Sequence, residues 1–445
     1  MNYIGRGLGL CVDLLVTTRG AYNNKCVFLS KDGRIGSIKN LEGRRPGLYV
    51  SDKPLLYFDS KVVALPSIVD IHVHLRGLRQ RYKEDPLSGT AAAAASGIAI
   101  VADMPNTDPP LRDPSALKAK LEELESKAFV DFGVYAGVPY DINDIQLLAS
   151  KEIIGFKIYP EDLHESEDKL CKLFLKAREK DLLVIVHPED PDLIKLEEGW
   201  SRETMRGCHV EESSLLHVAE IAQKCGSPRL HITHVSCPHT LLKAQQMGFS
   251  VDVTPHHLLL DSEPSSLFSD QACLFKVNPP LRNSITRWNL FLKALVDDNI
   301  IIASDHAPHA PEEKSMHPLL CPPGVSSLEY WPRILIHLYS SMRISLTDLA
   351  KKTSKRPASL IKVSDRGDIA PGNMGDIVVY RLEDYERVVS PIYSKATRTP
   401  YFMLEASIVE SHIIRGRLVY TIEDGLLVEP GFGENVAKLS RSRMR

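Results

Sequence analysis

Hydrophobic and polar positions follow two different patterns along the chain, and the change between them falls at Pro66. From there on, short and almost wholly apolar runs alternate with stretches of helical composition or periodicity. The apolar runs cover residues 66–74, 97–106, 131–137, 153–159, 182–187, 229–235, 249–257 and 299–306, and the clearest helical stretches cover 114–128, 165–180, 212–225 and 239–247. Buried strands separated by helices are typical of a parallel sheet covered on both faces, and eight such units predict an α/β fold, a closed (β/α)8 TIM-like barrel.

The two ends of the chain have a different pattern, in which short alternating runs are separated by Gly and Asp-Gly turns. Residues 1–62 and residues 363–445 both show it, whereas 63–362 carry the barrel pattern. We therefore predict that the N- and C-terminal segments pair into one small satellite domain, a β-sandwich beside the barrel.

Charge and hydropathy narrow the class of partner. The 445 residues include 54 Lys and Arg against 57 Asp and Glu, a net charge of −3. This balance predicts no nucleic acid partner and no anionic membrane surface. The sequence has no apolar run of about 18 residues, the length that would span a membrane, and its start lacks the pattern of a secretory signal.

The cysteines are scattered. Eight are present, without a C-x-x-C pair, a spacing unlike that of a zinc finger or a small disulfide framework. This pattern favours reduced thiols in a cytoplasmic protein.

Polar side chains follow the predicted strands at the end where barrel enzymes carry their chemistry. His72 and His74 end the first strand, and because they are two apart on an extended segment, both imidazoles project to one side. Such a pair alone also fits ordinary hydrogen-bonded histidines. Later strands end in Lys157, His187, His234 and Asp305. Because buried polar groups cost free energy unless they are paired or metal-bound, the joint pattern predicts a metal site.

Lys157 is the unusual member of this set, because an ammonium group cannot bind a metal ion. Burial beside cations should lower its pKa, and the neutral amine can react with CO₂ to give a carbamate, which is a bridging anion. The alternative is a structural lysine paired with Glu161 or Asp162.

Eight short motifs at these strand ends, taken together and in order, resemble those of the dihydroorotase family of the amidohydrolase superfamily. They are DIHVHLR (70–76), ADMPNTDPP (102–110), GFKIY (155–159), VIVHPED (184–190), HITHVS (231–236), TPHHL (254–258), KVNPPLR (276–282) and SDHAPH (304–309). The tail motif GDIAPGNMGDIVV (367–379) resembles the strand-turn-strand signature of the superfamily's satellite domain.

The resemblance implies two zinc ions per subunit. His72, His74 and Asp305 would hold one, His187 and His234 the other, and carbamylated Lys157 would bridge them together with a hydroxide. It also implies that Asp305 carries the proton from the attacking hydroxide to the departing nitrogen, as L-dihydroorotate and N-carbamoyl-L-aspartate are interconverted.

The resemblance also implies the substrate contacts. Arg76, Asn106 and His309 would bind the substrate carboxylate, for which a planar guanidinium is well shaped. Asn278 and the backbone around Pro323 and Gly324 would read the ring amide. The chain departs from the family after Arg76, where Gly77-Leu78-Arg79 replaces an acidic residue followed by Pro-Gly. Arg79 or Arg81 sharing the role of Arg76 is therefore an open alternative. His256 and His257 are left out of the site as structural.

Two other functions compete. A dihydropyrimidinase, hydantoinase or allantoinase would use the same metals on another ring, and such relatives generally lack an arginine placed like Arg76. A metal-free scaffold barrel would have lost ligands, and here none is missing. The expected partner is a small-molecule substrate. Homo-oligomers are common among such barrels, and long dihydroorotases in some cases associate with aspartate transcarbamoylase, but the sequence shows neither.

Overall fold

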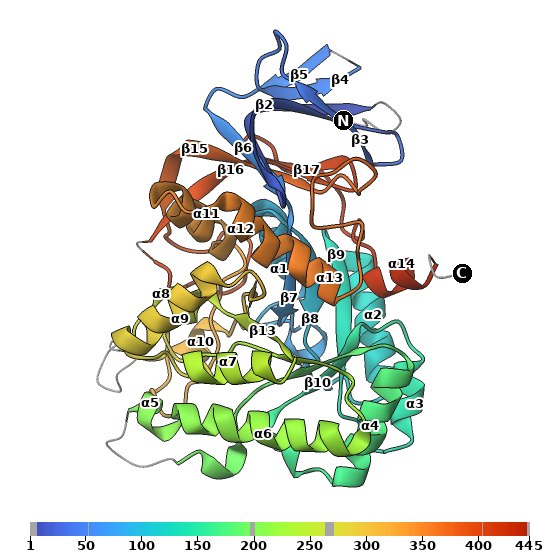
Figure 1. Cartoon of the computed structure of the whole chain (residues 1–445), viewed down its shortest axis with the longest axis vertical. Coiled ribbons are helices and arrows are strands. Elements are labelled where there is room, and N and C mark those ends of the chain that lie inside the picture. Colours follow the sequence, from blue (N-terminus) through green and yellow to red (C-terminus); the bar gives the residue numbers. More distant parts are fainter. Residues whose placement is uncertain (1–6, 52, 196–200, 263–270, 403, 443–445) are drawn as a thin grey trace.

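The computed structural model describes residues 7–51, 53–195, 201–262, 271–402 and 404–442. Its centre is a parallel sheet of eight strands, hydrogen-bonded in chain order (Figure 1). They are β7 (Ile68–Val73), β8 (Ile98–Asp103), β9 (Asp131–Gly137), β10 (Gly155–Ile158), β11 (Leu183–Val186), β12 (Arg229–Ile232), β13 (Ser250–Val253) and β14 (Ile301–Ile302). A bridge between Val73 and His306 joins the first strand to the last, so the sheet is a nearly closed barrel. The predicted fold class is confirmed.

The observed strands are shorter than the predicted apolar runs. The run 299–306 contains only Ile301–Ile302 as a strand, because the backbone turns at Asp305, which has a φ of 45°. Six of the eight strands are buried along their whole length. Burial on both faces is expected for barrel strands, because helices cover the outer face and packed side chains fill the inside.

Helices surround the barrel, and all four predicted helical stretches are confirmed as α2 (Pro114–Lys127), α4 (Glu167–Glu179), α6 (Cys208–Cys225) and α7 (Pro238–Gln246). Polar residues start several helices: the side chains of Asp85, Asp113, Ser166 and Asn283 each accept a hydrogen bond from a backbone amide of the first turn. The remaining helices are α1 (Pro86–Ser96), α3 (Asp144–Ala149), α5 (Arg202–Met205), α8 (Pro255–Leu259), α9 (Ser284–Val296), α10 (Pro311–Lys314), α11 (Trp331–Ser341), α12 (Leu346–Ala350), α13 (Arg356–Leu360) and α14 (Val436–Ser442), with short turns η1 (Leu78–Gln80), η2 (Pro160–His164), η3 (Pro191–Leu193) and the π-helical η5 (Lys351–Lys355).

The second sheet combines both ends of the chain, as predicted. Its strands are β1 (Leu8–Thr17), β2 (Gly20–Leu29), β3 (Ile35–Asn40), β4 (Gly47–Val50), β5 (Lys53–Tyr57), β6 (Val62–Pro66), β15 (Ile377–Arg387), β16 (Glu405–Ile414), β17 (Arg417–Thr421) and β18 (Gly425–Leu426). The two ends meet where β6 pairs antiparallel with β15. A separate apolar cluster, which includes Leu10, Val27, Val62, Ile377 and Ile413, forms the core of this sheet. The sheet lies at one end of the barrel (Figure 1).

The prediction of reduced cysteines is wrong. All eight are paired, as Cys11–Cys26, Cys171–Cys225, Cys208–Cys237 and Cys273–Cys321. The partners are 15 to 54 residues apart in the sequence. Spacing rules recognise metal sites and small cystine frameworks, but here strand pairing and helix packing bring the partners together, and this information is absent from the spacing.

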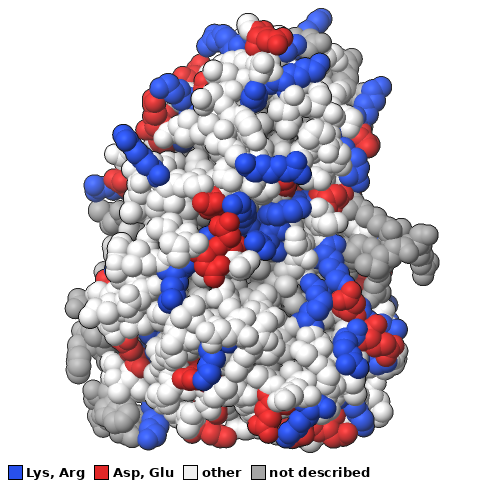
Figure 2. Space-filling model, in the orientation of Figure 1, with Lys and Arg blue, Asp and Glu red and all other residues white. Residues whose placement is uncertain are grey.

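Charged side chains of both signs are interspersed over the face of the molecule in Figure 2, without a broad area of one sign. Among the described residues, no helix is both long and apolar enough to cross a membrane.

Candidate active site

The side chains at the carboxyl ends of the barrel strands line one cavity of about 330 Å³. All six predicted metal ligands lie there, together with five of the six predicted substrate contacts. The lining residues are His72, His74, Arg76, Asn106, Lys157, Tyr159, Pro160, Glu161, His187, Arg206, His234, Asn278, Asp305, Ala307, Pro323 and Gly324.

His72 is oriented by a buried chain of hydrogen bonds. Asp252 on β13 accepts the hydroxyl proton of Thr233 at 2.7 Å, so the Thr233 oxygen is free to accept from His72 Nδ1 at 2.6 Å. This assigns the proton of His72 to Nδ1 and leaves the Nε2 lone pair facing the cavity. Burial, with Lys157 as the next cause, holds the pKa of His72 well below its usual range, so the ring is neutral, as a ligand must be.

His74 has the same arrangement with a different partner. Its Nδ1 lies 2.5 Å from Oδ1 of Asn106, the acceptor atom of that amide, and its Nε2 lies 3.2 Å from Asp305 Oδ1. His72 Nε2 is also 3.2 Å from that oxygen. One potential ligand atom from each of His72, His74 and Asp305 lies within 4.8 Å of the other two, so these residues form a group that could hold a metal ion.

His187 and His234 lie beside this group. Their rings are 4.4 Å apart, and the ring of His234 is 5.2 Å from that of His72. His187 Nε2 contacts Glu189 at 2.7 Å, and Arg206 fixes that carboxylate with two hydrogen bonds of 2.8 and 2.7 Å. His187 is thereby left with Nδ1 as its potential ligand atom. His234 Nδ1 is buried without a hydrogen-bond partner.

Lys157, on β10, is completely buried, and its side-chain nitrogen has no hydrogen-bond partner among the residues that the structure describes. Burial lowers the pKa of Lys157 to about 7, against the opposing effect of Asp305 and other nearby carboxylates. The alternative, an ion pair of Lys157 with Glu161 or Asp162, is not formed. Asp162 instead pairs with Arg112 at 2.6 Å, and Glu161 lies 3.7 Å from the same guanidinium.

Arg76 is a buried cation at the edge of the same cavity. Its Nε donates to the carbonyl oxygen of Pro308 at 3.3 Å, and its Nη2 lies 3.3 Å from His309 Nε2. Its backbone is fixed by Lys120, whose Nζ donates to the Arg76 carbonyl at 2.9 Å and pairs with Asp103 at 2.8 Å. No carboxylate partner of the Arg76 side chain is among the described contacts, so the guanidinium is available to an anion.

His309 lies behind Arg76 and outside the cavity lining. Its Nε2 is 2.9 Å from the carbonyl oxygen of Pro323. Burial and the neighbouring cations Arg76, Lys314 and Lys83 hold its pKa far below the usual range, so the ring is neutral. Gly324 has a φ of 135°, and a side chain there would overlap the backbone oxygen of Ala307, so only glycine fits this wall of the cavity.

Several residues of the site were not predicted from sequence. Tyr159 and Arg206 line the cavity, and Thr233, Asp252 and Glu189 orient the histidines. A signal for two of them exists: Asp252 interrupts an apolar strand and Glu189 follows His187 by two residues, and a buried carboxylate needs a partner. The exposed Arg79 and Arg81 and the buried pair His256 and His257 do not line the cavity.

A nearly closed parallel barrel with histidines, a lysine and an aspartate at its strand ends defines a class of metal-dependent barrel hydrolase. Residues 63–419 match the model of the amidohydrolase family. This match covers most of the chain, so the protein belongs to the amidohydrolase family.

Curated relatives narrow the family further. A protein named dihydroorotase from Aeropyrum pernix is 40% identical over 425 residues, which cover 94% of this chain and 96% of the relative. Proteins of the same name from Sulfolobus acidocaldarius and Saccharolobus solfataricus are 35% and 34% identical and are covered over 90% and 97% of their lengths. Within the amidohydrolase family, the chain thus groups with the dihydroorotases.

Solved structures agree on the fold. L-hydantoinase (dihydropyrimidinase) from Arthrobacter aurescens superimposes with a TM-score of 0.82, covering 94% of this chain and 97% of that one, at 21% identity. Dihydropyrimidinase from Brevibacillus agri gives a TM-score of 0.81 at 21% identity, covering 96% and 98%. These similarities establish the shared architecture of barrel and satellite sheet.

Proposed function

We propose that this protein is a dihydroorotase, which catalyses the reversible interconversion of L-dihydroorotate and N-carbamoyl-L-aspartate in pyrimidine biosynthesis. The observation that carries the proposal is the buried guanidinium of Arg76 in the cavity that also contains His72, His74 and Asp305. Both proposed ligands carry a carboxylate, and an arginine is the side chain suited to bind it. The names of the curated relatives support the same activity.

The donor set fits two zinc ions. His72, His74 and Asp305 would hold the first ion and His187 and His234 the second, with Lys157 as a bridging carbamate. Imidazole nitrogen and carboxylate oxygen are ligands that zinc accepts. Two nitrogens of this donor set, Lys157 Nζ and His234 Nδ1, are buried without a hydrogen-bond partner among the described residues. They support the assignment, because burying such groups is costly unless something binds them.

When bound, the zinc ions would polarise the carbonyl that is attacked and make a bound water more acidic. Asp305 accepts the proton released as the water attacks the ring amide, and donates it to the departing ring nitrogen. Its Oδ1 lies 3.2 Å from Nε2 of both His72 and His74, which supports this role for Asp305. Ring closure follows the same steps in reverse.

Substrate orientation is assigned to five residues of the cavity lining and to His309 behind Arg76. Arg76 binds the carboxylate in bidentate fashion, and Asn106 and His309 support it. Asn278 and the backbone at Pro323 and Gly324 bind the ring amide. Asn278 is held in place by Arg202, whose Nη2 donates to its side-chain oxygen and to the carbonyl oxygen of Val277.

The second candidate function is that of a dihydropyrimidinase or hydantoinase, which the solved structures of the same fold favour. Rings such as dihydrouracil and hydantoin have no carboxylate, so this function leaves the buried charge of Arg76 without a ligand. A buried cation without a partner costs free energy, which favours the carboxylate-bearing ring.

We further place the reaction in the cytoplasm, with a small molecule as the partner. Cytosolic disulfides are rare and intracellular proteins of hyperthermophiles are the exception, so the four bridges fit a cytoplasmic location only in such an organism. Self-association and association with aspartate transcarbamoylase are tested by measuring the mass of the protein in solution, alone and mixed with that enzyme.

Metal dependence provides the test of the proposed chemistry. The protein is stripped with a chelator, and the interconversion of L-dihydroorotate and N-carbamoyl-L-aspartate is followed as Zn²⁺ is returned in the presence of bicarbonate. We expect activity to be lost on stripping and to return in proportion to bound zinc, reaching its maximum at two ions per chain. Full activity in the stripped protein would contradict the proposal.

A further inference from the structure

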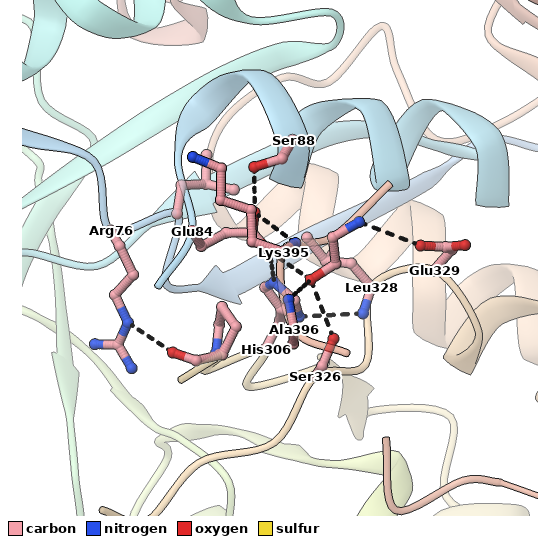
Figure 3. A network of polar contacts seen from close by, with 12 residues as sticks. Arg76, Glu84, Ser88, His306, Ser326, Leu328, Glu329, Lys395 and Ala396 are labelled. Carbon is pink, nitrogen blue, oxygen red and sulfur yellow. Dashed lines mark hydrogen bonds and ion pairs between the residues drawn. The ribbon is translucent and has the colours of Figure 1, made fainter. Parts of the chain in front are cut away.

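A second buried polar cluster lies behind Asp305, and none of its acidic members lines the cavity. Its centre is Glu84, at the end of the loop between β7 and α1, and its carboxylate is completely buried (Figure 3). Glu84 Oε2 lies 3.6 Å from Nε2 of His306, the residue directly after Asp305. His306 is also completely buried.

The hydrogen bonds of His306 decide which of its nitrogens carries the proton. Nδ1 accepts from the backbone amides of Ser327 at 3.1 Å and Leu328 at 3.3 Å. An acceptor nitrogen has no proton in the neutral ring, so the proton is on Nε2, which faces Glu84. Nε2 has no hydrogen-bond partner among the described residues, and the carboxylate of Glu84 is the charge it faces. Because Glu84 and His306 are both buried away from solvent, the attraction between the carboxylate and the Nε2 proton is weakly screened.

His306 in turn fixes the backbone that presents Asp305. Its carbonyl oxygen accepts from the His74 amide at 2.7 Å, and its own amide donates to Ser304 Oγ at 3.0 Å. Asp305, between these anchors, has a φ of 45°, a left-handed conformation that side-chain-bearing residues seldom adopt. Such a backbone persists only where its surroundings hold it.

The satellite sheet completes the site around Glu84. Residues 388–402, which we call the connecting segment, leave β15 and return to the barrel before β16. Ser394 Oγ donates to Glu84 Oε2 at 2.5 Å, and the Lys395 amide donates to Oε1 at 3.3 Å. Ser88 Oγ also donates to Glu84 Oε1. A further anchor is Glu329, which accepts from the amides of Ile392, Tyr393 and Ser394.

We propose that Glu84 is a positioning residue: it holds His306, and through His306 the turn that carries Asp305, while the connecting segment completes the binding site of its carboxylate. The inference rests on the role of Asp305 in the proposed function. The position of Asp305 then depends in part on the connecting segment between two strands of the satellite sheet. None of the described residues of that sheet lines the cavity.

Two variants address the Glu84–His306 contact. Glu84→Gln keeps the shape of the side chain but removes its charge. His306→Asn keeps an acceptor near the position of Nδ1 for the two backbone amides and removes the group that faces Glu84. We expect each to lower kcat for L-dihydroorotate by about tenfold to a hundredfold, because small misplacements of a catalytic group cost this much. KM should change by less than about threefold, and the double variant should be no worse than the more affected single variant.

A readout independent of turnover is the visible spectrum of the Co²⁺-loaded protein, which responds to the ligand geometry around the ion. We expect the spectrum of Glu84→Gln to differ from that of the wild type. If the wild type does not convert L-dihydroorotate, the proposed function fails, and the spectrum alone then decides the positioning role. Identical spectra for wild type and Glu84→Gln would overturn it.

The matched control is Glu410→Gln, which removes the charge of another buried carboxylate, paired with Arg381 in the satellite sheet, and has no described contact with Glu84, His306 or the connecting segment. We expect it to lower the melting temperature while kcat stays within about twofold of wild type. If Glu84→Gln does not fold, Ser394→Ala replaces it, because it removes one donor to the same carboxylate oxygen. An equal loss of kcat in Glu410→Gln, or no loss in either Glu84→Gln or Ser394→Ala, would overturn the proposal.

Discussion

Three residues of the proposed site have a left-handed backbone although they carry side chains. Arg76, His234 and Asp305 have φ values of 49°, 42° and 45°. Each such residue costs on the order of 1–3 kcal/mol, and this cost is typically found where function needs a fixed geometry. In our assignment Arg76 binds the carboxylate, His234 holds the second metal and Asp305 holds the first, so these three strained positions, among others in the chain, lie at the proposed chemistry.

Asp305 is the residue whose loss should be most severe. We expect Asp305→Ala to lower kcat by at least about a thousandfold, because it removes both a proton carrier and a metal ligand. The fold should remain, since Asp305 contributes no apolar contact to the barrel core. The measurement is steady-state turnover together with circular dichroism, with the exposed Asp108→Asn as control. Turnover near the wild-type value would refute this role.

Arg76 should decide between substrates rather than set the rate. Replacing it with Met should raise KM for L-dihydroorotate about a hundredfold, the cost of an unpaired carboxylate in a buried site. The kcat for L-dihydroorotate should change little, because the guanidinium binds the substrate carboxylate and not the ring amide that reacts. Arg79→Met is the matched control, because that side chain is 76% exposed and its one ion pair within the described part of the chain is with Asp108 at 3.6 Å. An equal rise in KM for the control would transfer the role to Arg79.

Lys157 should be modified in a pH-dependent way. Burial lowers its pKa to about 7, so the neutral amine, the form that reacts with CO₂, predominates above pH 7 and is lost as the pH falls below it. We expect ¹³C-bicarbonate to give a carbamate signal that grows as the pH rises through about 7. Lys157→Arg should abolish the signal, whereas Lys120→Arg, at another completely buried lysine, should not. A signal that is unchanged in Lys157→Arg would assign the carbamate elsewhere.

At the scale of elements, the strands were predictable and much of what fixes the site was not. All eight barrel strands were located, because each is a buried apolar run followed by a polar residue. His72 and Lys157 could be placed for the same reason. The partner that orients His72 could not be: Thr233 becomes recognisable only when strands far apart in sequence lie side by side. The contact of Ser394 with Glu84 spans 310 residues and leaves no local signal.

The wall formed by Pro323 and Gly324 is held by its own anchors. The disulfide Cys273–Cys321 ties it to the residues before Lys276. Lys276 Nζ donates to the carbonyl oxygen of Pro318 at 2.7 Å, and Lys314 Nζ donates to that of Pro322 at 3.0 Å. These contacts keep the wall ordered before the substrate binds.

Opening this disulfide should therefore affect substrate binding. We expect Cys321→Ser to raise KM for L-dihydroorotate about fivefold with little change in kcat. Without the disulfide, the wall would become ordered only as the substrate binds, and this would make the free energy of binding less favourable. The control is Cys171→Ser, which opens the bridge between α4 and α6 and should leave KM unchanged. An unchanged KM in Cys321→Ser would show that the lysines suffice to hold the wall.

At the scale of the whole molecule, the two sheets and the four disulfides form one connected unit. The sheet that joins the chain ends depends on β6 pairing with β15, and β6 leads directly into the first barrel strand. The bridges close loops of 15 to 54 residues. Bridges of this size typically contribute about 2–4 kcal/mol each to the free energy of unfolding.

Complete reduction should lower the stability of the protein by several kcal/mol. We expect the guanidinium midpoint of unfolding to fall clearly when all four bridges are reduced and the thiols blocked under native conditions. The control is the same blocking treatment without reductant, which should change nothing because the eight cysteines are paired. Free thiols in the untreated protein would contradict the pairing itself.

The central claim is that this amidohydrolase acts on a ring that carries a carboxylate. The most direct measurement compares ring opening of L-dihydroorotate, dihydrouracil, hydantoin and allantoin by the zinc-loaded wild-type protein, each with a chelator-treated control. The account predicts turnover of L-dihydroorotate alone, lost on removal of the metal. Efficient opening of dihydrouracil or hydantoin, with no activity on L-dihydroorotate, would contradict it.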